Sequence, residues 1–281
     1  MKNSEYISAE IIDDSSDEEE YVIIPKKTRK TQKLETEKSK SKKGSLKPPM
    51  ALLKKFYDET ENIIEIGVDE AGRGPLFGRV YTAAVILPKD DTFNHSLMKD
   101  SKKFHSKKKI EEVANYIKEN ALAWYVSFED EKIIDEINIL QATQQSMHTS
   151  ILEVRKQFNK NQIDNNKEER KDYSYNLLID GNYFNPITIL NKKTNKLDTL
   201  PYLTVEGGDN KYSSIAAASI LAKVERDKYI EELCEKNPTL SEYYGIDSNK
   251  GYGAKRHIEG IKEHGITIWH RRSFGICKNY V

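Results

Sequence analysis

The fold is decided by Ile66-Gly67-Val68-Asp69-Glu70-Ala71-Gly72-Arg73-Gly74-Pro75-Leu76-Phe77-Gly78. The apolar run of residues 63–68 enters this stretch and ends in two adjacent carboxylates, which a glycine-rich turn follows at once. A second apolar run, residues 80–87, comes after the turn and is closed by Pro88. Two β-branched runs joined by a short link predict an antiparallel pair of core strands.

The glycine turn has a rival interpretation, because Gly72, Gly74 and Gly78 superficially match a dinucleotide-binding fingerprint. That fingerprint must open into a helix, whereas Pro75 and the run from Val80 predict another strand. We therefore set the dinucleotide site aside. A glycine turn with free main-chain groups and one arginine can instead lie against a sugar-phosphate backbone and reach a ribose 2′-OH.

Further strands and helices follow from the spacing of apolar residues along the chain. Runs at 124–128, 177–181 and 202–205 predict three more strands. Apolar positions with a period of about 3.6 residues predict helices at 110–121, 138–158 (with Asn138 as cap), 213–233 and 257–263. Residues 159–175 are expected to form a polar surface insertion, and residues 190–199 a polar turn. The predicted fold class is α/β, with a mixed five-stranded sheet flanked by helices on both faces.

Three of the predicted strands end in acidic residues. Asp69 and Glu70 close the first strand, Asp180 closes the fourth, and Asp209 follows the fifth. Each has a glycine nearby, which lets backbone or ligand approach closely. Consecutive strand residues face opposite ways, so Asp69 and Glu70 can serve one site only if Glu70 lies at a frayed strand end.

Converging carboxylates require a compensating charge. Two like charges about 4 Å apart repel by roughly 4 kcal/mol at an effective dielectric constant of 20. Such groups share protons or hold cations, and ligands that are all oxygen favour Mg²⁺ or Mn²⁺ over zinc. Two such ions can activate a water and stabilise the leaving oxygen of a phosphodiester. Ordinary solvated acids at strand ends are the alternative, which suits Asp180 alone better than all four acids together.

Composition narrows the class of protein without deciding its partner. The formal net charge of the 281 residues is +0, and the two cysteines, Cys234 and Cys277, form no CxxC pair, so we expect reduced thiols in an intracellular protein. No apolar run is long enough to cross a membrane, and we expect a cytoplasmic protein. A site with carboxylates for metals and lysines for phosphates can be neutral overall.

The first 50 residues differ in composition from the rest. Residues 1–20 carry eight acidic and one basic side chain, and residues 21–48 carry ten basic and two acidic ones. So charged a segment with few apolar side chains is typical of disorder, and we expect a tail at 1–50 and a catalytic domain at 51–281. The basic half is also typical of a weak nucleic-acid contact or a nuclear import signal, and a solvated tail without a partner stays open.

With these residues in place, the chain resembles ribonuclease HII, the type 2 ribonuclease H family, over about residues 62–275. Several motifs occur in the family's order: Gly-Val-Asp-Glu-Ala-Gly-Arg-Gly-Pro at 67–75, Asp-Ser-Lys-Lys at 100–103, Asn-Ile-Leu-Gln-Ala-Thr at 138–143, Leu-Leu-Ile-Asp-Gly at 177–181, Gly-Asp-Asn-Lys at 208–211, Ala-Ala-Ala-Ser-Ile-Leu-Ala-Lys-Val-Glu-Arg-Asp at 216–227, Lys-Gly-Tyr-Gly at 250–253 and His-Arg-Arg-Ser-Phe at 270–274.

The resemblance implies a ribonuclease H-like fold with a C-terminal helical extension. It implies a two-metal site, with Mg²⁺ or Mn²⁺, on four carboxylates: Asp69, which would bridge both metals, Glu70, Asp180 and Asp209. It implies that Gly72, Arg73 and Gly74 read the 2′-OH and that Tyr252 stacks at an RNA–DNA junction. We further expect Lys102, Lys223 and Ser101 to contact phosphates. His257, His264 and His270 fit no zinc spacing and are expected to be structural.

The implied reaction is endonucleolytic hydrolysis of RNA in RNA/DNA hybrids, and at single ribonucleotides in duplex DNA, leaving 3′-OH and 5′-phosphate ends. Ala254 departs from the threonine that is usual in the family, which weakens a phosphate contact. Two alternatives stay open: a non-catalytic hybrid-binding protein and a DNA-specific nuclease of similar fold. A monomer is expected, while accessory subunits, the preferred metal and the balance between long hybrids and single ribonucleotides stay open.

Overall fold

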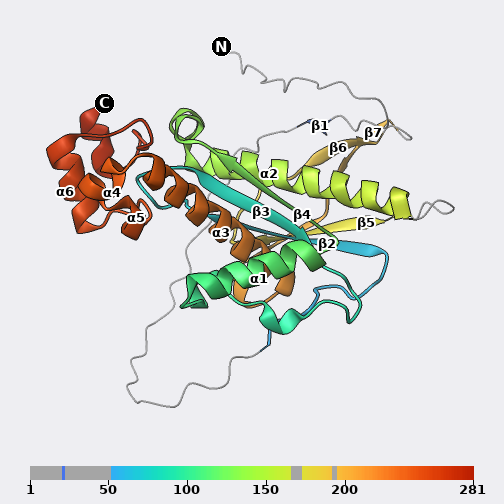
Figure 1. The fold of residues 1–281 in the computed structure, drawn as a ribbon. Coiled ribbons are helices and arrows are strands. Elements are labelled where there is room, and N and C mark those ends of the chain that lie inside the picture. The colour runs from blue at the N-terminus through green and yellow to red at the C-terminus, as the bar shows by residue number, and fades with distance from the viewer. Residues whose placement is uncertain (1–20, 23–51, 166–172, 192–194) are drawn as a thin grey trace, which may run out of the picture.

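A mixed five-stranded sheet forms the centre of the protein (Figure 1). The computed structural model describes residues 21–22, 52–165, 173–191 and 195–281. The strand order is β4-β3-β2-β5-β8, in which β2, β3 and β4 are antiparallel neighbours and β2, β5 and β8 run parallel. The strands are β2 (Ile63–Ala71), β3 (Val80–Ile86), β4 (Ala123–Glu129), β5 (Ser174–Asp180) and β8 (Tyr202–Val205). The predicted sheet and its antiparallel first pair are confirmed.

Helices cover both faces of this sheet, as predicted. On one face, α2 (Glu131–Asn165) packs Met147 and Ile151 against the apolar side chains of β2 and β5. On the other face, α1 (Lys107–Asn120) and α3 (Ser213–Lys236) pack against Ala83 and Val85 of β3 (Figure 1). The two separate apolar clusters fix the sheet between two helical layers.

The small residues of α3 allow an unusually close approach to the central strand. A Cβ atom on Gly67 of β2 would lie 2.2 Å from the backbone carbon of Ser214, and Ala216, Ala217 and Ala218 are fully buried. No side chain larger than hydrogen fits at Gly67 without moving the helix. The run of alanines in α3 therefore packs directly against the backbone of β2.

Asn138 interrupts α2. Its backbone has a φ of 68°, and its side-chain Oδ1 accepts hydrogen bonds from the backbone N–H groups of Leu140 (3.0 Å) and Gln141 (3.2 Å). Asn138 therefore caps the helix that follows, as predicted. The helical turns before it, which begin at Glu131, were not predicted.

Two segments differ from the sequence expectation. Residues 159–165 continue α2 and β5 begins at Ser174, so these parts of 159–175 are not an insertion, and residues 166–172 lie outside the described residues. The predicted polar turn at 190–199 was wrong. Its residues belong to β6 (Thr188–Asn191) and β7 (Lys196–Thr199), which pair antiparallel. Every residue of β7 is exposed, so it carries no alternation of apolar and polar residues that sequence reasoning could detect.

Most of the predicted tail lies outside the described residues. The exception is β1 (Tyr21–Val22), which pairs with Ile189 and Thr188 of β6 and completes a small sheet of order β1-β6-β7. That pair of residues therefore departs from the predicted disorder. Within the part of the chain that the structure describes, no helix is both long and apolar enough to cross a membrane.

The C-terminal helices form their own apolar cluster around one residue from the central turn. Phe77 is fully buried among Ile230, Leu240, Ile246 and Ile261. The sequence predicted only the last of the three α-helices, because the first two are very short. They are α4 (Thr239–Tyr244), α5 (Ile246–Asn249) and α6 (Lys255–His264). The short 3-10 helices are η1 (His95–Leu97), η2 (Ser101–Lys103), η3 (Gly208–Asn210) and η4 (Gly275–Tyr280).

Candidate active site

The four predicted carboxylates lie at one edge of the sheet, because the parallel strands β2, β5 and β8 end there. Pairing of β2 with β5 ends at Val68 and Ile179, just before Asp69 and Asp180. On its other side β2 continues alongside β3, where Glu70 still pairs with Thr82. The condition of a frayed strand end at Glu70 is therefore met only on the side of β5. Glu70 stays in the ladder with β3 and lies beyond the pairing with β5.

Hydrogen bonds hold these carboxylates in place. Oδ1 of Asp69 accepts from the backbone N–H of Glu70 at 2.7 Å, and the Ser219 hydroxyl of α3 also bonds this carboxylate. Oδ1 of Asp180 accepts from the backbone N–H of Gly208 at 2.6 Å. That bond ties the end of β5 to η3, which carries Asp209. The acids therefore sit on a rigid frame that both helix α3 and the strand ends contribute to.

The carboxylates affect one another electrostatically. Burial raises the pKa of Asp69 well above its usual range, and the charges of Glu70 and Asp180 raise it further. Burial also raises the pKa of Glu70, although Arg73, which pairs with it at 3.2 Å, partly offsets this. The pKa of Asp209 is raised by burial and by the charges of Asp100 and Asp180. Buried like charges of this kind are relieved by a cation.

The donor set fits a hard divalent ion, since it consists of carboxylate oxygens whose charges repel one another. Among the described residues, however, no three His, Cys, Asp or Glu side chains are arranged so that they could enclose one ion. Mg²⁺ suits such a site, because it keeps several waters and is held by one or two carboxylates plus substrate phosphates. The predicted set of four carboxylate ligands therefore stays a prediction.

Asp100 is a further acid at the site that sequence reasoning missed. Its Oδ2 accepts from Nδ2 of Asn210 at 3.1 Å, and the same nitrogen donates to Asp209 at 3.0 Å. Burial opposes ionisation, but bonds from the Lys102 backbone N–H and Asn210 and the Lys102 charge lower the pKa of Asp100. In the sequence Asp100 resembles an ordinary helix cap, and it does cap η2.

Arg271 holds the Gly72–Pro75 turn and is the second residue that the sequence analysis missed. It is fully buried and donates to four carbonyl oxygens. Nη2 donates to Gly72 at 2.6 Å, Nη1 to Arg73 and to Pro75 at 2.9 Å each, and Nε to Gly78 at 2.8 Å. Burial lowers the pKa of Arg271 to about 9, so its guanidinium stays charged at neutral pH. Adjacent arginines beside Trp269 and Phe274 are the signal that could have indicated a buried one.

Gly72 also meets a buried arginine from α3. Gly72 has a φ of +93°, and a Cβ there would lie 2.2 Å from Nε of Arg226. Nη2 of Arg226 donates to the Lys250 carbonyl at 2.8 Å, and its guanidinium carbon lies 6.0 Å from the centre of the Tyr252 ring. Arg226 thus lies between the turn and the tyrosine.

Tyr252 lies beside the turn with its ring half exposed. A Cβ on Gly74 would lie 3.6 Å from Cε1 of Tyr252, and 52% of the tyrosine is exposed. Of the residues predicted to recognise the sugar, Gly72, Arg73, Gly74 and Tyr252 are therefore adjacent. An exposed aromatic face next to a glycine-rich turn is suited to stacking on a nucleotide.

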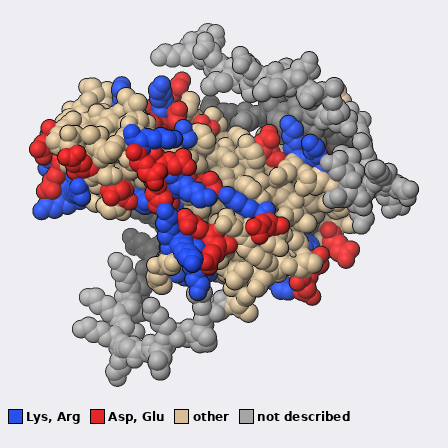
Figure 2. Space-filling view, in the orientation of Figure 1, with Lys and Arg blue, Asp and Glu red and all other residues tan. Residues whose placement is uncertain are grey.

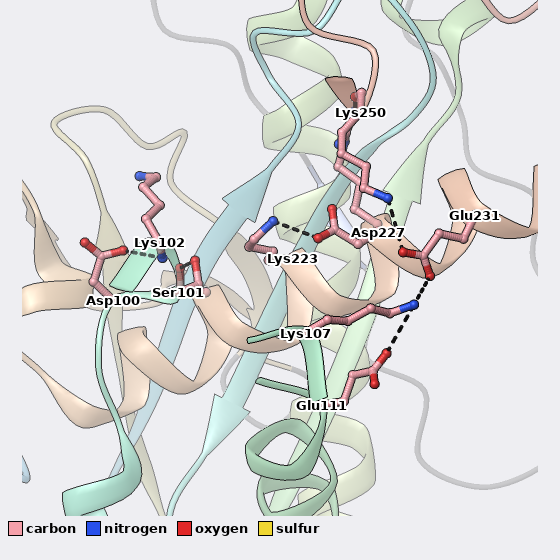
Figure 3. A network of polar contacts seen from close by, with 11 residues as sticks. Asp100, Ser101, Lys102, Lys107, Glu111, Lys223, Asp227, Glu231 and Lys250 are labelled. Atoms are coloured by element: carbon pink, nitrogen blue, oxygen red, sulfur yellow. Dashed lines mark hydrogen bonds and ion pairs between the residues drawn. The ribbon is translucent and has the colours of Figure 1, made fainter. Parts of the chain in front are cut away.

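The predicted phosphate contacts differ in their surroundings (Figure 3). Lys102 is exposed, and its charge lowers the pKa values of Glu70 and Asp209, so it lies within electrostatic reach of the carboxylates. Lys223 pairs with Asp227 at 2.7 Å. Ser101 is buried, and its Oγ lies 3.0 Å from that of Ser219, the residue that bonds Asp69. All three phosphate contacts stay predictions, and the Ser101 hydroxyl is already engaged inside the protein.

Basic and acidic side chains are interspersed on the face shown in Figure 2, as the net charge of +0 suggests. Lys107 pairs with Glu231 at 2.5 Å, and Lys250 pairs with the same glutamate at 3.1 Å (Figure 3). These pairs join the start of α1 to α3 and to the segment before Tyr252. The ion pairs on this face therefore link the elements around the site, and the basic side chains do not form a separate basic patch.

His257 and His270 are structural, as predicted, and form a hydrogen-bonded chain. The backbone N–H of Thr267 donates to Nδ1 of His270 at 2.9 Å, so the proton of this ring is on Nε2. The two Nε2 atoms are 3.1 Å apart, and Nδ1 of His257 then donates to the Tyr252 carbonyl at 2.8 Å. Both rings are buried and neutral, and they fix the backbone that carries Tyr252.

Acidification is expected to destabilise the protein through this histidine pair. Burial and the neighbouring His257 lower the pKa of His270 to about 3, and burial lowers that of His257. Because the unfolded chain binds more protons below about pH 6.5, the free energy of unfolding falls as pH falls from there toward 3. When the pH falls from about 7.5 to 5.5, the free energy of unfolding should fall by about 1 kcal/mol less in His270→Gln than in the wild type. Urea denaturation at the two pH values measures this difference. The exposed His105→Gln is the control, and equal losses in all three proteins would contradict the assignment.

Known proteins match this chain over most of its length. The family model for ribonuclease HII matches residues 66–277. Ribonuclease HII of Bacteroides thetaiotaomicron is 43% identical over 218 residues, which are 77% of this chain and 92% of that protein. Ribonuclease HII of Neisseria meningitidis serogroup C is 39% identical over 220 residues, 78% of this chain and 95% of that protein.

Solved structures match the fold. Ribonuclease H2 from Pyrococcus horikoshii OT3 has a TM-score of 0.54 at 21% identity and covers 77% of this chain and 96% of its own. Bst-RNase HIII in complex with Mn²⁺ has a TM-score of 0.52 at 18% identity, over 78% of this chain and 69% of its own. The fold is that of the ribonucleases H2 and H3, a class of nucleases with a mixed sheet and a helical C-terminal part.

The sequence match is more specific than the fold. The chain belongs to the ribonuclease HII family, and it is a nuclease, a ribonuclease H. Ribonucleases H depend on divalent metal ions.

Proposed function

We propose that this ribonuclease H hydrolyses the RNA strand of RNA/DNA hybrids and also cuts at single ribonucleotides in duplex DNA, leaving 3′-OH and 5′-phosphate ends. The observation that carries this proposal is the contact between two groups of residues. The carboxylate edge of the sheet leads directly into the Gly72–Gly74 turn, against which Tyr252 lies. A nucleotide held by the turn and the tyrosine would present its phosphate to the acids.

Each residue has a task in this proposal. Asp69, Glu70, Asp180 and Asp209 would hold the ions. Two divalent ions, when bound, supply an activated water and stabilise the leaving oxygen. The backbone of Gly72 and Gly74 would bond the ribose 2′-OH, and Arg271 would keep that backbone rigid. Lys102 and Lys223 would hold neighbouring phosphates, and Tyr252 would stack on the junction nucleotide. Mg²⁺ and Mn²⁺ both suit the oxygen donor set, and Mn²⁺ is bound by the structurally similar Bst-RNase HIII.

The test is cleavage mapping on an end-labelled duplex with one embedded ribonucleotide. The full chain is expected to cut next to the ribonucleotide with Mg²⁺ or Mn²⁺ and to lose activity with a chelator. An all-DNA duplex of the same sequence is the matched control. Equal cutting of the two duplexes would replace this proposal by a DNA-specific nuclease, and binding without cutting would favour a hybrid-binding protein. Tyr252→Ala should lower kcat/KM about 10-fold, because one aromatic stack contributes about 1–3 kcal/mol.

A further inference from the structure

A cavity of about 270 Å³ adjoins the carboxylates on the side of the sheet that α2 covers. Glu70, Arg73 and Asp180 line it on one side, and Leu140, Gln144 and Met147 of α2 line it on the other. The segment directly after β5, residues 181–183, also lines it. None of the tasks proposed above uses this space, although two of the proposed metal ligands border it.

Gln144 offers a hydrogen-bond donor to this cavity. Its side chain is only 4% exposed, and its Oε1 accepts from the backbone N–H of Asn185 at 2.7 Å. Within the described residues, Nε2 of Gln144 has only the thioether sulfur of Met147 as partner, at 3.9 Å. Thioether sulfur is a weak acceptor, so this buried amide is close to unsatisfied. An oxygen atom of a ligand in the cavity would satisfy it.

The remaining lining selects a neutral, amphipathic ligand. Leu140 and Met147 offer an apolar surface beside the Gln144 amide, and burying a charged phosphate against apolar side chains is unfavourable. A pentose has a C–H face for the apolar residues and ring or hydroxyl oxygens for the Gln144 amide. The sugar part of a nucleotide therefore fits better than its phosphate.

The position of the cavity indicates which sugar it would take. Tyr252 belongs to the C-terminal part and Arg226 to α3, whereas residues of α2 line the cavity. Helices α2 and α3 cover opposite faces of the sheet (Figure 1). The carboxylates and the Gly72–Gly74 turn lie between them. A strand held at Tyr252 that passes the carboxylates would continue toward the cavity.

We propose that this cavity binds the sugar of the cleaved strand that lies across the scissile phosphate from the nucleotide at Tyr252. The inference rests on the function proposed above. Gln144 is then a substrate-binding residue, and the cavity is a subsite that fixes the strand on the second side of the cut.

Gln144→Glu tests the donor with little change in shape. The glutamate keeps an oxygen to accept from the Asn185 N–H but lacks the N–H group that faces the cavity. Gln141→Glu is the matched control, because it adds the same charge one turn earlier in α2, at a residue whose Oε1 accepts from Nδ2 of Asn185 at 3.4 Å. Leu140→Trp is an independent variant that fills the cavity from its partly buried wall. Thermal unfolding checks that each variant is folded.

The measurement is kcat/KM of the wild type and of each variant on the intact duplex and on modified duplexes. In the duplex with one ribonucleotide, the deoxynucleotide on each side of the ribonucleotide is replaced in turn by a propanediol spacer, which lacks sugar and base, or by an abasic deoxyribose. The variant Tyr252→Ala identifies the neighbour on the tyrosine side. Once that neighbour is replaced, Tyr252→Ala should cause no further loss of kcat/KM. We expect Gln144→Glu and Leu140→Trp to lower kcat/KM about 10-fold on the intact duplex and on the abasic one. On the spacer at the other neighbour, they should cause no further loss.

Three results would overturn the inference. Equal losses on the intact and spacer duplexes would show that Gln144 acts through the carboxylates or the fold. An equal loss in Gln141→Glu would show that added charge alone is responsible. Disappearance of the effect already on the abasic duplex would assign the cavity to a base. If the wild type cuts the intact duplex normally, these results remove only the subsite, whereas a wild type that does not cut overturns the proposed function itself.

Discussion

Asp69→Asn should abolish hydrolysis of a ribonucleotide-containing duplex, with kcat/KM falling about 10³-fold or more. An amide cannot supply the negative charge that holds a divalent ion, and such an ion contributes several kcal/mol to the transition state. The amide group can still form hydrogen bonds with the backbone N–H of Glu70 and with Ser219, so the local structure should persist. Single-turnover cleavage with Mg²⁺ measures the loss, and a binding assay should give nearly unchanged affinity.

The same variant should be more stable than the wild type in metal-free buffer. Burial and the charges of Glu70 and Asp180 raise the pKa of Asp69, which means that its carboxylate destabilises the folded protein. Removing one like charge should raise the free energy of unfolding by on the order of 1 kcal/mol. Asp91→Asn is the control, because the Asp91 side chain is 98% exposed and should change neither property. Full activity of Asp69→Asn, or a lower stability, would contradict the assignment of Asp69 as a metal ligand.

Arg271→Met should lower the free energy of unfolding by at least about 3 kcal/mol. Methionine has a similar length but no donors, so the carbonyls that Arg271 now bonds in the turn lose their partner, at about 1–3 kcal/mol for each buried group. Urea denaturation measures the loss. Where the variant is still folded, kcat/KM should fall about 100-fold, since a displaced turn misplaces the sugar it is proposed to hold.

Two further variants separate charge from geometry at this position. Arg271→Lys keeps the charge, but one ammonium cannot reproduce the planar fork that reaches Gly72, Arg73, Pro75 and Gly78 together, so its stability should be intermediate. Arg272→Met changes the exposed neighbour and should have wild-type stability. If Arg271→Met had the same urea midpoint of unfolding as the wild type, the role given to Arg271 would be refuted.

Sequence reasoning predicted the central sheet because its strands follow simple rules. Ile63–Val68 and the other β-branched runs are long enough to identify, and glycines mark where Asp69 and Asp180 end them. The parallel arrangement of β2, β5 and β8 then brings these acids to one edge, which is why the predicted carboxylates lie together. Local sequence patterns were therefore sufficient to predict a residue's place when that place depends only on the strand that carries the residue.

The parts that were missed depend on tertiary contacts. Arg271 is buried only because the turn folds onto it, and a basic residue is otherwise expected at the surface. Ser101 is buried because α3 presents Ser219 to it, and the local sequence does not reveal this burial. The exposed β7 strand and the short α4 and α5 lack any apolar periodicity. None of these features is encoded within a window of neighbouring residues.

The separation between Arg271 and the turn that it holds also orders events during synthesis. The hydrogen bond between Arg271 and Gly72 spans 199 residues, so the ribosome adds nearly all of the described chain before the turn can be fixed. At about 5–20 residues per second, this interval is roughly 10–40 s. The carboxylates of β2 and β5 emerge well before its end. The growing chain therefore carries its acids early but gains the rigid turn late.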